Sequence, residues 1–152
     1  MHIAYLKDHQ DAIPTVAQWL FEQWGHLPPD NTLEKTVATL YENLHDDRIP
    51  LTIIAFSGDD VVGTASLIEQ DLQTRPDLTP WLASVFVVPE QRGRGIGAAL
   101  VRAIVDRART LGVSPLYLFT PDKEAFYRHL GWQTVETTNY RGEDVVIMQI
   151  VP

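Results

Sequence analysis

The stretch from Val87 to Leu100 reads VVPEQRGRGIGAAL and constrains the fold more than any other part of the chain. An apolar strand expected over 82–88 stops at Pro89, and a turn with alternating glycines then opens into a helix with apolar periodicity. The first turn of a helix has backbone N–H groups without intrahelical partners and lies at the positive end of the helix dipole. The sequence therefore predicts a strand–turn–helix unit that binds an anion such as phosphate.

The residue types of this turn support the same interpretation. Gly93, Gly95 and Gly97 let a ligand approach the backbone and permit dihedral angles closed to other residues. Arg92 and Arg94 supply charge-assisted donors. The spacing lacks GxxxxGK[ST] and reads GxGxG rather than GxGxxG, which argues against a P-loop and a dinucleotide-binding Rossmann turn. The alternative is a glycine-rich connection with solvated arginines.

Length and composition exclude several other classes. The 152 residues predict a single domain over 1–152 with one core. The chain has no cysteine, which excludes disulfides, a thiolate nucleophile and a thiolate metal site, and no histidine–carboxylate cluster has metal-ligand spacing. No apolar run is long enough for a membrane span, and the first ten residues lack the apolar core of a signal peptide, so we expect a cytoplasmic protein.

Charge separates two kinds of partner. A formal net charge of −8 argues against nucleic-acid binding, because phosphate contacts need a basic face. Arginines concentrate in the glycine turn and the helix that follows it, and we expect Arg102 and Arg107 on that helix to be solvated. This distribution fits an anionic cofactor at the turn and a cationic substrate elsewhere.

Periodicity predicts the remaining elements. A helix over 13–24 tolerates Pro14 in its first turn, and a second helix from Leu33, capped by Asn31 with Glu34, should turn Tyr41 inward. The other predicted elements are a strand over 2–6, a hairpin over 51–56 and 61–68, a polar loop over 70–80, the strand over 82–88, a helix over 96–111 capped by Gly112, a strand over 116–119, a short helix over 124–130 and a hairpin over 133–140 and 143–150.

The segment Arg92-x-x-Gly95-x-Gly97 closely resembles the acyl-CoA signature R/Q-x-x-G-x-G/A of the GNAT superfamily of N-acyltransferases. The element order β-αα-β-β-β-α-β-α-β-β also resembles that family over the whole chain. The resemblance implies an α/β (α+β) GNAT fold, with a central mixed, mostly antiparallel sheet of about seven strands flanked by about four helices.

The same resemblance implies a site for acetyl-CoA, with no metal. The pantetheine arm would pair with the backbone of Val85, Phe86 and Val87, where the amide near Val87 would polarise the thioester carbonyl. The pyrophosphate would be held by the turn beside Arg92, namely by Gly93, Arg94, Gly95, Ile96, Gly97 and Ala98.

A second block, Phe126 to Trp132 (FYRHLGW), is similar to the family's FYxxxGF. The family tyrosine protonates the departing CoA thiolate, and it corresponds to Tyr127. The alternative is a tyrosine that only packs on Trp132. Many relatives bind the cofactor arm with an asparagine seven positions earlier, whereas this chain has Thr120, which can donate one hydrogen bond.

The general base is less well defined. Relatives often place a glutamate on the central strand, but 81–88 contains no acid. Asp71 is our preferred base, and Glu69 is the alternative two residues before it. Both could instead be solvated loop charges, in which case a chain of waters would remove the proton of the amine. His129 should face away from Tyr127, and His26 lies on the expected substrate side but is more typical of a surface residue.

The resemblance implies an acetyl-CoA-dependent N-acetyltransferase that transfers the acetyl group directly to a primary amine on a small molecule or peptide. Trp19, Trp24, Trp81 and Tyr140 are expected walls of the acceptor pocket. The alternative is a non-catalytic acyl-CoA-binding module of the same fold, suggested by the missing strand glutamate. The oligomeric state is open, with a homodimer as one option.

Overall fold

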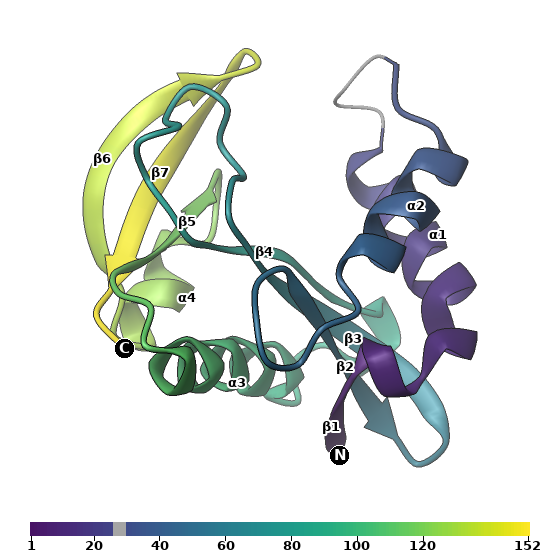
Figure 1. Cartoon of the computed structure of the whole chain (residues 1–152). Coiled ribbons are helices and arrows are strands. Elements are labelled where there is room, and N and C mark those ends of the chain that lie inside the picture. The colour runs from purple at the N-terminus through teal and green to yellow at the C-terminus, as the bar shows by residue number, and fades with distance from the viewer. Residues whose placement is uncertain (26–29) are drawn as a thin grey trace.

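A seven-stranded mixed sheet forms the centre of the computed structural model, which describes residues 1–25 and 30–152. The strand order is β1-β2-β3-β4-β5-β7-β6, and only the β4–β5 pair is parallel (Figure 1). The predicted fold class and element order are therefore confirmed. The strands are β1 (His2–Tyr5), β2 (Leu51–Ser57), β3 (Asp60–Ile68), β4 (Trp81–Val87), β5 (Leu116–Thr120), β6 (Gln133–Tyr140) and β7 (Glu143–Ile150).

Within the residues that the structure describes, four α-helices flank the sheet, and most of their ends follow local sequence signals. Pro14 lies in the first turn of α1 (Ile13–Trp24), and α3 (Ile96–Leu111) ends at Gly112 in the left-handed conformation, with φ of 72°. The cap of α2 (Leu33–Glu42) differs from the prediction, because Thr32 Oγ1 accepts from the Lys35 amide at 3.1 Å while Asn31 donates toward Gly25 and Thr36. The fourth helix is α4 (Glu124–His129), and short 3₁₀ turns are η1 (Leu6–Asp8), η2 (Gln10–Ala12) and η3 (Pro89–Gln91).

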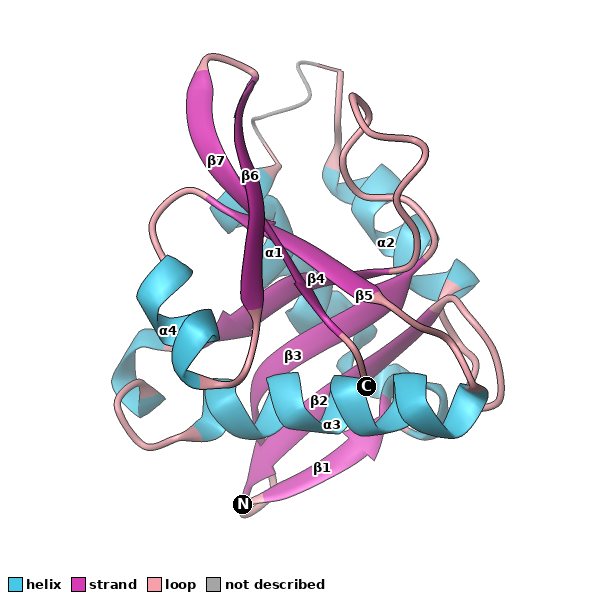
Figure 2. Ribbon diagram, turned by 90° about the vertical axis from the view of Figure 1, so that its left-hand side faces the viewer, coloured by secondary structure: helices cyan, strands magenta, loops and turns pink. Residues whose placement is uncertain are grey.

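The two faces of the sheet are covered differently (Figure 2). Helix α3 packs on one face with Leu100, Ile104 and Ala108, and Tyr127 of α4 belongs to the same core. Helices α1 and α2 cover the opposite face of β1–β3 through a second cluster centred on Ile13 and Ile54. We call these the α3 face and the α1 face.

The α1 face of the C-terminal strands is covered by the loop over 69–80, not by a helix. The polar loop predicted here is confirmed as a loop, and one of its few apolar residues, Leu72, is fully buried with Trp81 and Ile147. Because apolar side chains leave water wherever the chain offers them a surface, Leu72 seats this loop on the sheet. We call it the 69–80 loop.

Strands β4 and β5 pair only at their beginning. Trp81 pairs with Tyr117, and within the described residues no further β4 residue pairs with β5. A bulge in the β3–β4 ladder accompanies this divergence: Ser66 pairs with Ala83 and Thr64 with Phe86, while Ser84 between them has a φ of 56°. The bulge re-aims the end of β4, and its edge toward β5 is left open; we call this opening the splay.

Two surface predictions are wrong for physical reasons. Tyr41 is 54% exposed, because it lies on the outer side of α2. Arg107 is half-buried instead of solvated: its Nη2 donates to the Asp46 carbonyl at 3.1 Å and its guanidinium lies 5.6 Å from the Tyr5 ring centroid. Arg107 therefore fastens the segment before β2 to α3.

Candidate functional site

The glycine turn presents the N-terminus of α3 as an anion site. Gly95 occupies the N-cap with φ of 82°, and the first closed helical bond runs from the Ala99 amide to the Gly95 carbonyl at 3.0 Å. The amides of Ile96, Gly97 and Ala98 precede this bond, so they have no intrahelical acceptor. These three N–H groups lie at the positive end of a 16-residue helix and can bind a phosphate group.

The backbone of the turn is also free of steric obstruction. A Cβ atom added to Gly93 or Gly95 would meet no heavy atom within 4 Å. Both residues have positive φ, 78° and 82°, which explains glycine at both positions. At Gly97 a Cβ would make only ordinary contacts, 3.8 Å to Val87 and 3.9 Å to Phe126. The residues at this turn therefore fit the pyrophosphate of a CoA molecule.

The two arginines of the turn are placed differently. The Nε atom of Arg92 donates to the Val87 carbonyl at 2.8 Å, and its guanidinium lies 5.5 Å from the Phe86 ring centroid. Arg92 thus braces the end of β4, and its remaining N–H groups are the donors it can offer to an anion. Arg94 is exposed and reaches only Gln91, at 3.3 Å.

The end of β4 offers a strand edge to a ligand in the splay. The Val88 amide bonds to Val62 of β3 at 2.9 Å. Since consecutive backbone groups in a strand point to opposite edges, the backbone groups of Val87 and Val85 point toward the splay. Of these groups, the Val87 carbonyl accepts from Arg92 Nε at 2.8 Å. An extended amide-containing chain such as pantetheine can pair with this edge. Phe86, between them, turns its side chain to Trp19 and Trp24 on the α1 face.

Tyr127 lies on the α3 face, where its ring packs edge-on against Trp132 with centroids 6.1 Å apart. Burial, with a smaller contribution from the Asp122 carboxylate, raises the pKa of Tyr127 to about 12. The hydroxyl therefore keeps its proton at neutral pH. The expected packing on Trp132 is confirmed, and it is compatible with a proton-donating role.

Thr120 ends β5 on the same face and is buried. Its Oγ1 accepts from the Lys123 amide at 3.0 Å, which shapes the turn leading into α4. The hydroxyl proton is still available to a ligand, so Thr120 can offer the single donor that the sequence suggests.

Asp71 is the third residue of the 69–80 loop and follows Ile68, which pairs with Trp81 where β4 meets β5. The side chain is half-buried, and burial raises the pKa of its carboxyl to about 7. A carboxylate with this pKa is suited to exchange protons near neutral pH. Glu69 is exposed and lacks that environment.

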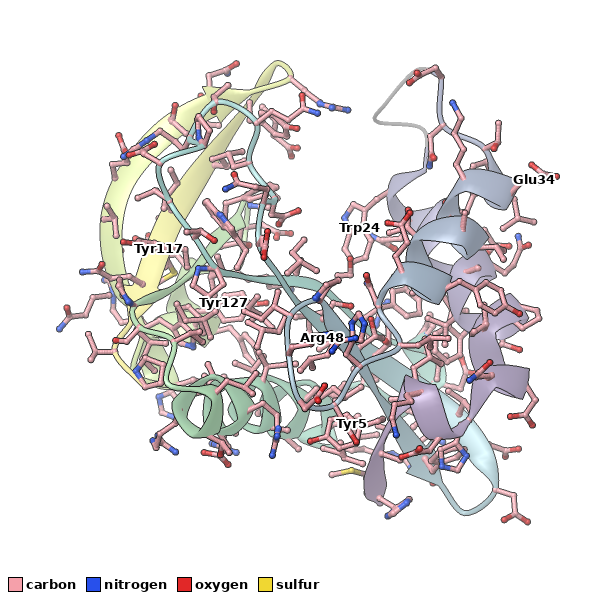
Figure 3. The ribbon with its side chains drawn as sticks, viewed as in Figure 1. Tyr5, Trp24, Glu34, Arg48, Tyr117 and Tyr127 are labelled. Atoms are coloured by element: carbon pink, nitrogen blue, oxygen red, sulfur yellow. The ribbon has the colours of Figure 1, made fainter. Side chains whose placement is uncertain are left out.

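Aromatic side chains of α1 and β4 meet on the α1 face. Trp19 stacks on Phe86 at 5.5 Å and Trp24 contacts it edge-on at 6.5 Å. A pocket of about 390 Å³ lies beside this cluster, lined by Trp19, Glu22, Gln23, Phe86, Val88, Pro89, Glu90 and Arg92. Figure 3 shows Trp24 and Tyr127 on opposite sides of β4.

One of the expected pocket walls, Trp81, is wrong. Trp81 is fully buried beneath the 69–80 loop, and its indole N–H donates to the Leu78 carbonyl at 2.7 Å, so it cannot contact an acceptor directly. Tyr140 remains half-buried at the end of β6, where it packs on Phe119 with centroids 5.6 Å apart.

The histidines add little to this site. His129 is exposed while Tyr127 is buried, so the two side chains face different ways, as predicted. His26 lies outside the described residues. Among the described residues, no group of three or more His, Asp or Glu side chains could hold a metal ion. In the same part of the chain, no helix combines the length and apolar character of a membrane span.

Two features of the site were not predicted. The bulge requires a positive φ at Ser84, and serine is not a residue type that indicates a positive φ in a sequence. Arg75 forms an ion pair with its near neighbour Asp77 and a second one with Glu136 of β6, which is distant in sequence. A sequence signal exists only for the first pair, since Arg75 and Asp77 are two residues apart.

With this geometry in place, the chain belongs to the acetyltransferase (GNAT) family, whose family model matches residues 13–132. No curated protein matches the sequence. Among solved structures, aminoglycoside 6'-acetyltransferase type Ii is similar, with a TM-score of 0.77, 20% identity and coverage of 99% of this chain and 97% of that one.

Two further structures share the fold. An aminoglycoside 6'-N-acetyltransferase complexed with coenzyme A has a TM-score of 0.71 and 19% identity, covering 99% of this chain and 97% of that one. A ribosomal-protein-alanine N-acetyltransferase from Brucella melitensis has a TM-score of 0.74 and 21% identity, and covers 100% of both chains. At these identities the similarity establishes the fold and leaves the acceptor open.

Proposed function

We propose that this protein transfers an acetyl group from acetyl-CoA to a primary amine on a small molecule or peptide. The proposal is carried by the combination of two features: free helix-terminal amides at 96–98, and the open edge of β4 that precedes the glycine turn in the chain. Together these features match two adjoining parts of a CoA molecule, the anionic pyrophosphate and the amide-containing pantetheine arm. Similar structures include an acetyltransferase in complex with coenzyme A.

The two faces of the sheet supply the proton transfers. Acetyl-CoA supplies an activated acyl thioester. Asp71, in the loop that covers the α1 face, would accept the proton that the amine loses as its nitrogen bonds to the acyl carbon. Tyr127, on the α3 face, would donate its proton to the departing sulfur, and the amide N–H of Val87 would hold the carbonyl oxygen. The amine becomes an amide, the thioester becomes a thiol, and both residues return to their starting states by proton exchange with water.

The acceptor is proposed to be cationic. The chain carries a formal net charge of −8, and Glu22 and Glu90 line the pocket beside Trp19 and Phe86. Two of the similar structures are enzymes named for aminoglycosides, which gives small polycationic amines a place in the first panel to be tested.

The test is release of CoA thiol from acetyl-CoA, measured with a panel of amines that includes aminoglycosides, polyamines and peptides with free N-termini. We expect release that depends on the amine, with the acetylated product identified by mass spectrometry. Tight binding of acetyl-CoA without release across the panel would contradict the proposal and indicate a binding module.

A further inference from the structure

Arg75 joins the two halves of the molecule across the splay. The 69–80 loop leaves β3 and returns to β4, on one side of the splay, while Glu136 belongs to β6, on the other. Arg75 forms an ion pair with Glu136. It also donates two hydrogen bonds to the Asp77 carboxylate, from Nε at 3.1 Å and from Nη2 at 3.0 Å. The side chain thus holds a loop from one half of the sheet onto the other.

The backbone of Arg75 is equally central to the loop. Its amide donates to the Leu72 carbonyl at 3.0 Å, and its carbonyl accepts from the Leu78 amide at 3.2 Å. Thr79 Oγ1 closes the base of the loop onto the Glu69 carbonyl at 2.7 Å. These hydrogen bonds link Arg75 to Leu72 within one folded loop, so a shift of Arg75 would also move the residues near Leu72.

Asp71 is the immediate neighbour of Leu72, whose side chain is fully buried against Trp81 and Ile147. Glu136 pairs with Ile147 in the β6–β7 ladder, and directly opposed residues share a face, so Arg75 and Leu72 contact the same patch of the sheet. The loop is therefore held at two points, one apolar and one ionic, and Asp71 lies beside the apolar one.

From this arrangement we propose that Arg75 is a positioning residue, which fixes the position of the Asp71 carboxylate by anchoring the 69–80 loop to Glu136. The proposal rests on the proposed function for the role of Asp71. Arg75 and Glu136 keep 30% and 41% of their side-chain surface exposed, and exposed pairs of this kind contribute little to global stability. The pair therefore acts mainly by fixing the position of the 69–80 loop.

The kinetic test uses Arg75→Met, Arg75→Lys and Glu136→Gln, with Arg109→Met as matched control. Arg109 is exposed near the end of α3 and pairs with Asp106 at 2.7 Å. We expect Arg75→Met to lower kcat/KM for the amine by about tenfold, as displaced catalytic groups do, while KM for acetyl-CoA and the thermal melt stay unchanged. Arg75→Lys should restore part of the rate, and Glu136→Gln should lower it in the same direction.

Dependence on Asp71 is decided in the Asp71→Asn background. If Arg75 acts through Asp71, adding Arg75→Met to Asp71→Asn should cost no further activity. An equal cost in both backgrounds would overturn the proposal, because Arg75 would then act independently of Asp71.

A second measurement keeps the proposal testable without turnover. NMR titration of the Asp71 carboxyl carbon should show a raised pKa in the wild type and in Arg109→Met, and a pKa nearer the ordinary value in Arg75→Met, because a released loop admits water. Glu69, Asp77 and Glu136 are the other acids of the loop and its anchor and should be assigned in the same spectra. An unchanged Asp71 pKa in Arg75→Met overturns the positioning role, whereas absence of amine-dependent thiol release with a shifted pKa counts against the proposed function alone.

Discussion

The Tyr127 hydroxyl is the group on which the proposed chemistry depends most directly. Tyr127→Phe should lower kcat by about 10²- to 10⁴-fold, the range for a lost general acid, with acetyl-CoA affinity nearly unchanged. Only one oxygen is removed, so the edge-on packing against Trp132 persists. Steady-state kinetics with a thermal melt would separate this from a structural role. A fully active Phe variant would show that Tyr127 only packs in the core.

The raised pKa of Asp71 predicts opposite pH dependences for the reaction rate and for the stability of the fold. A base must be deprotonated, so with a pKa of about 7 the rate should rise with pH and level off above neutrality. Asp71→Asn should abolish this rise together with most of the activity. Phe replacement at Tyr127, whose pKa lies near 12, should leave the rise in place at its lower rate.

The stability of the fold should respond in the other direction. The folded-state pKa of Asp71 is raised above its ordinary value of 3.8, so the folded protein binds the proton more tightly than the unfolded chain. The free energy of unfolding therefore falls as pH rises from about 4 to about 7 and is flat above that. Asp71→Asn should lose this fall and be more stable than wild type at pH 8 but not at pH 4, as urea titrations at the two pH values would show. Equal effects at both values would mean that Asp71 is solvated.

At the scale of elements, the N-terminus of α3 can be tested with a control at its other end. Gly95→Val places a branched side chain among the free amides and should reduce CoA affinity at least tenfold. It also strains the backbone, because φ is 82°, at a cost of about 1–3 kcal/mol. Gly112→Val carries comparable strain, with φ of 72° and no neighbouring atoms, at the C-terminus of the same helix.

Calorimetric titration of CoA into both folded variants separates strain from obstruction. We expect Gly112→Val to bind CoA like wild type in spite of its lower melting temperature. Similar affinities in the two variants would remove the pyrophosphate site from the turn.

The elements could be predicted from sequence wherever the signal is local. The bounds of β6 and β7 were predicted to the residue, because the tight turn at Arg141-Gly142 separates them, and Gly112 was predicted as the cap that ends α3. The glycine turn of the candidate site is local in the same way. The burial of Leu72 and Trp81, the Arg107 contact with Asp46 and the Arg75 anchor all depend on residues brought together by the sheet, and no periodicity within one segment carries that information.

At the scale of the whole molecule, neighbouring strands β4 and β5 that share a single paired residue would let one domain bind the two substrates of the proposed reaction. The α3 face carries the helix terminus and Tyr127, and the α1 face carries the 69–80 loop and the Trp19–Phe86 cluster. The splay is the opening in the sheet through which groups on the two faces can reach the same ligand. A direct transfer between two bound substrates therefore needs no residue to carry the acyl group, consistent with a chain that has no cysteine.

Charge at this scale predicts which acceptors are preferred. With 20 acidic and 12 basic residues, the chain should attract cationic amines, and at low ionic strength we expect kcat/KM for a polyamine to exceed that for an acidic peptide by about tenfold or more. The preference should shrink as salt is raised, because the Debye length falls from about 10 Å at 0.1 M to about 3 Å at 1 M. Over the same range KM for acetyl-CoA should increase, since its phosphates meet an arginine-bearing turn. Turnover of both acceptors measured from low to high salt tests the argument, and a preference for the acidic peptide at low salt would overturn it.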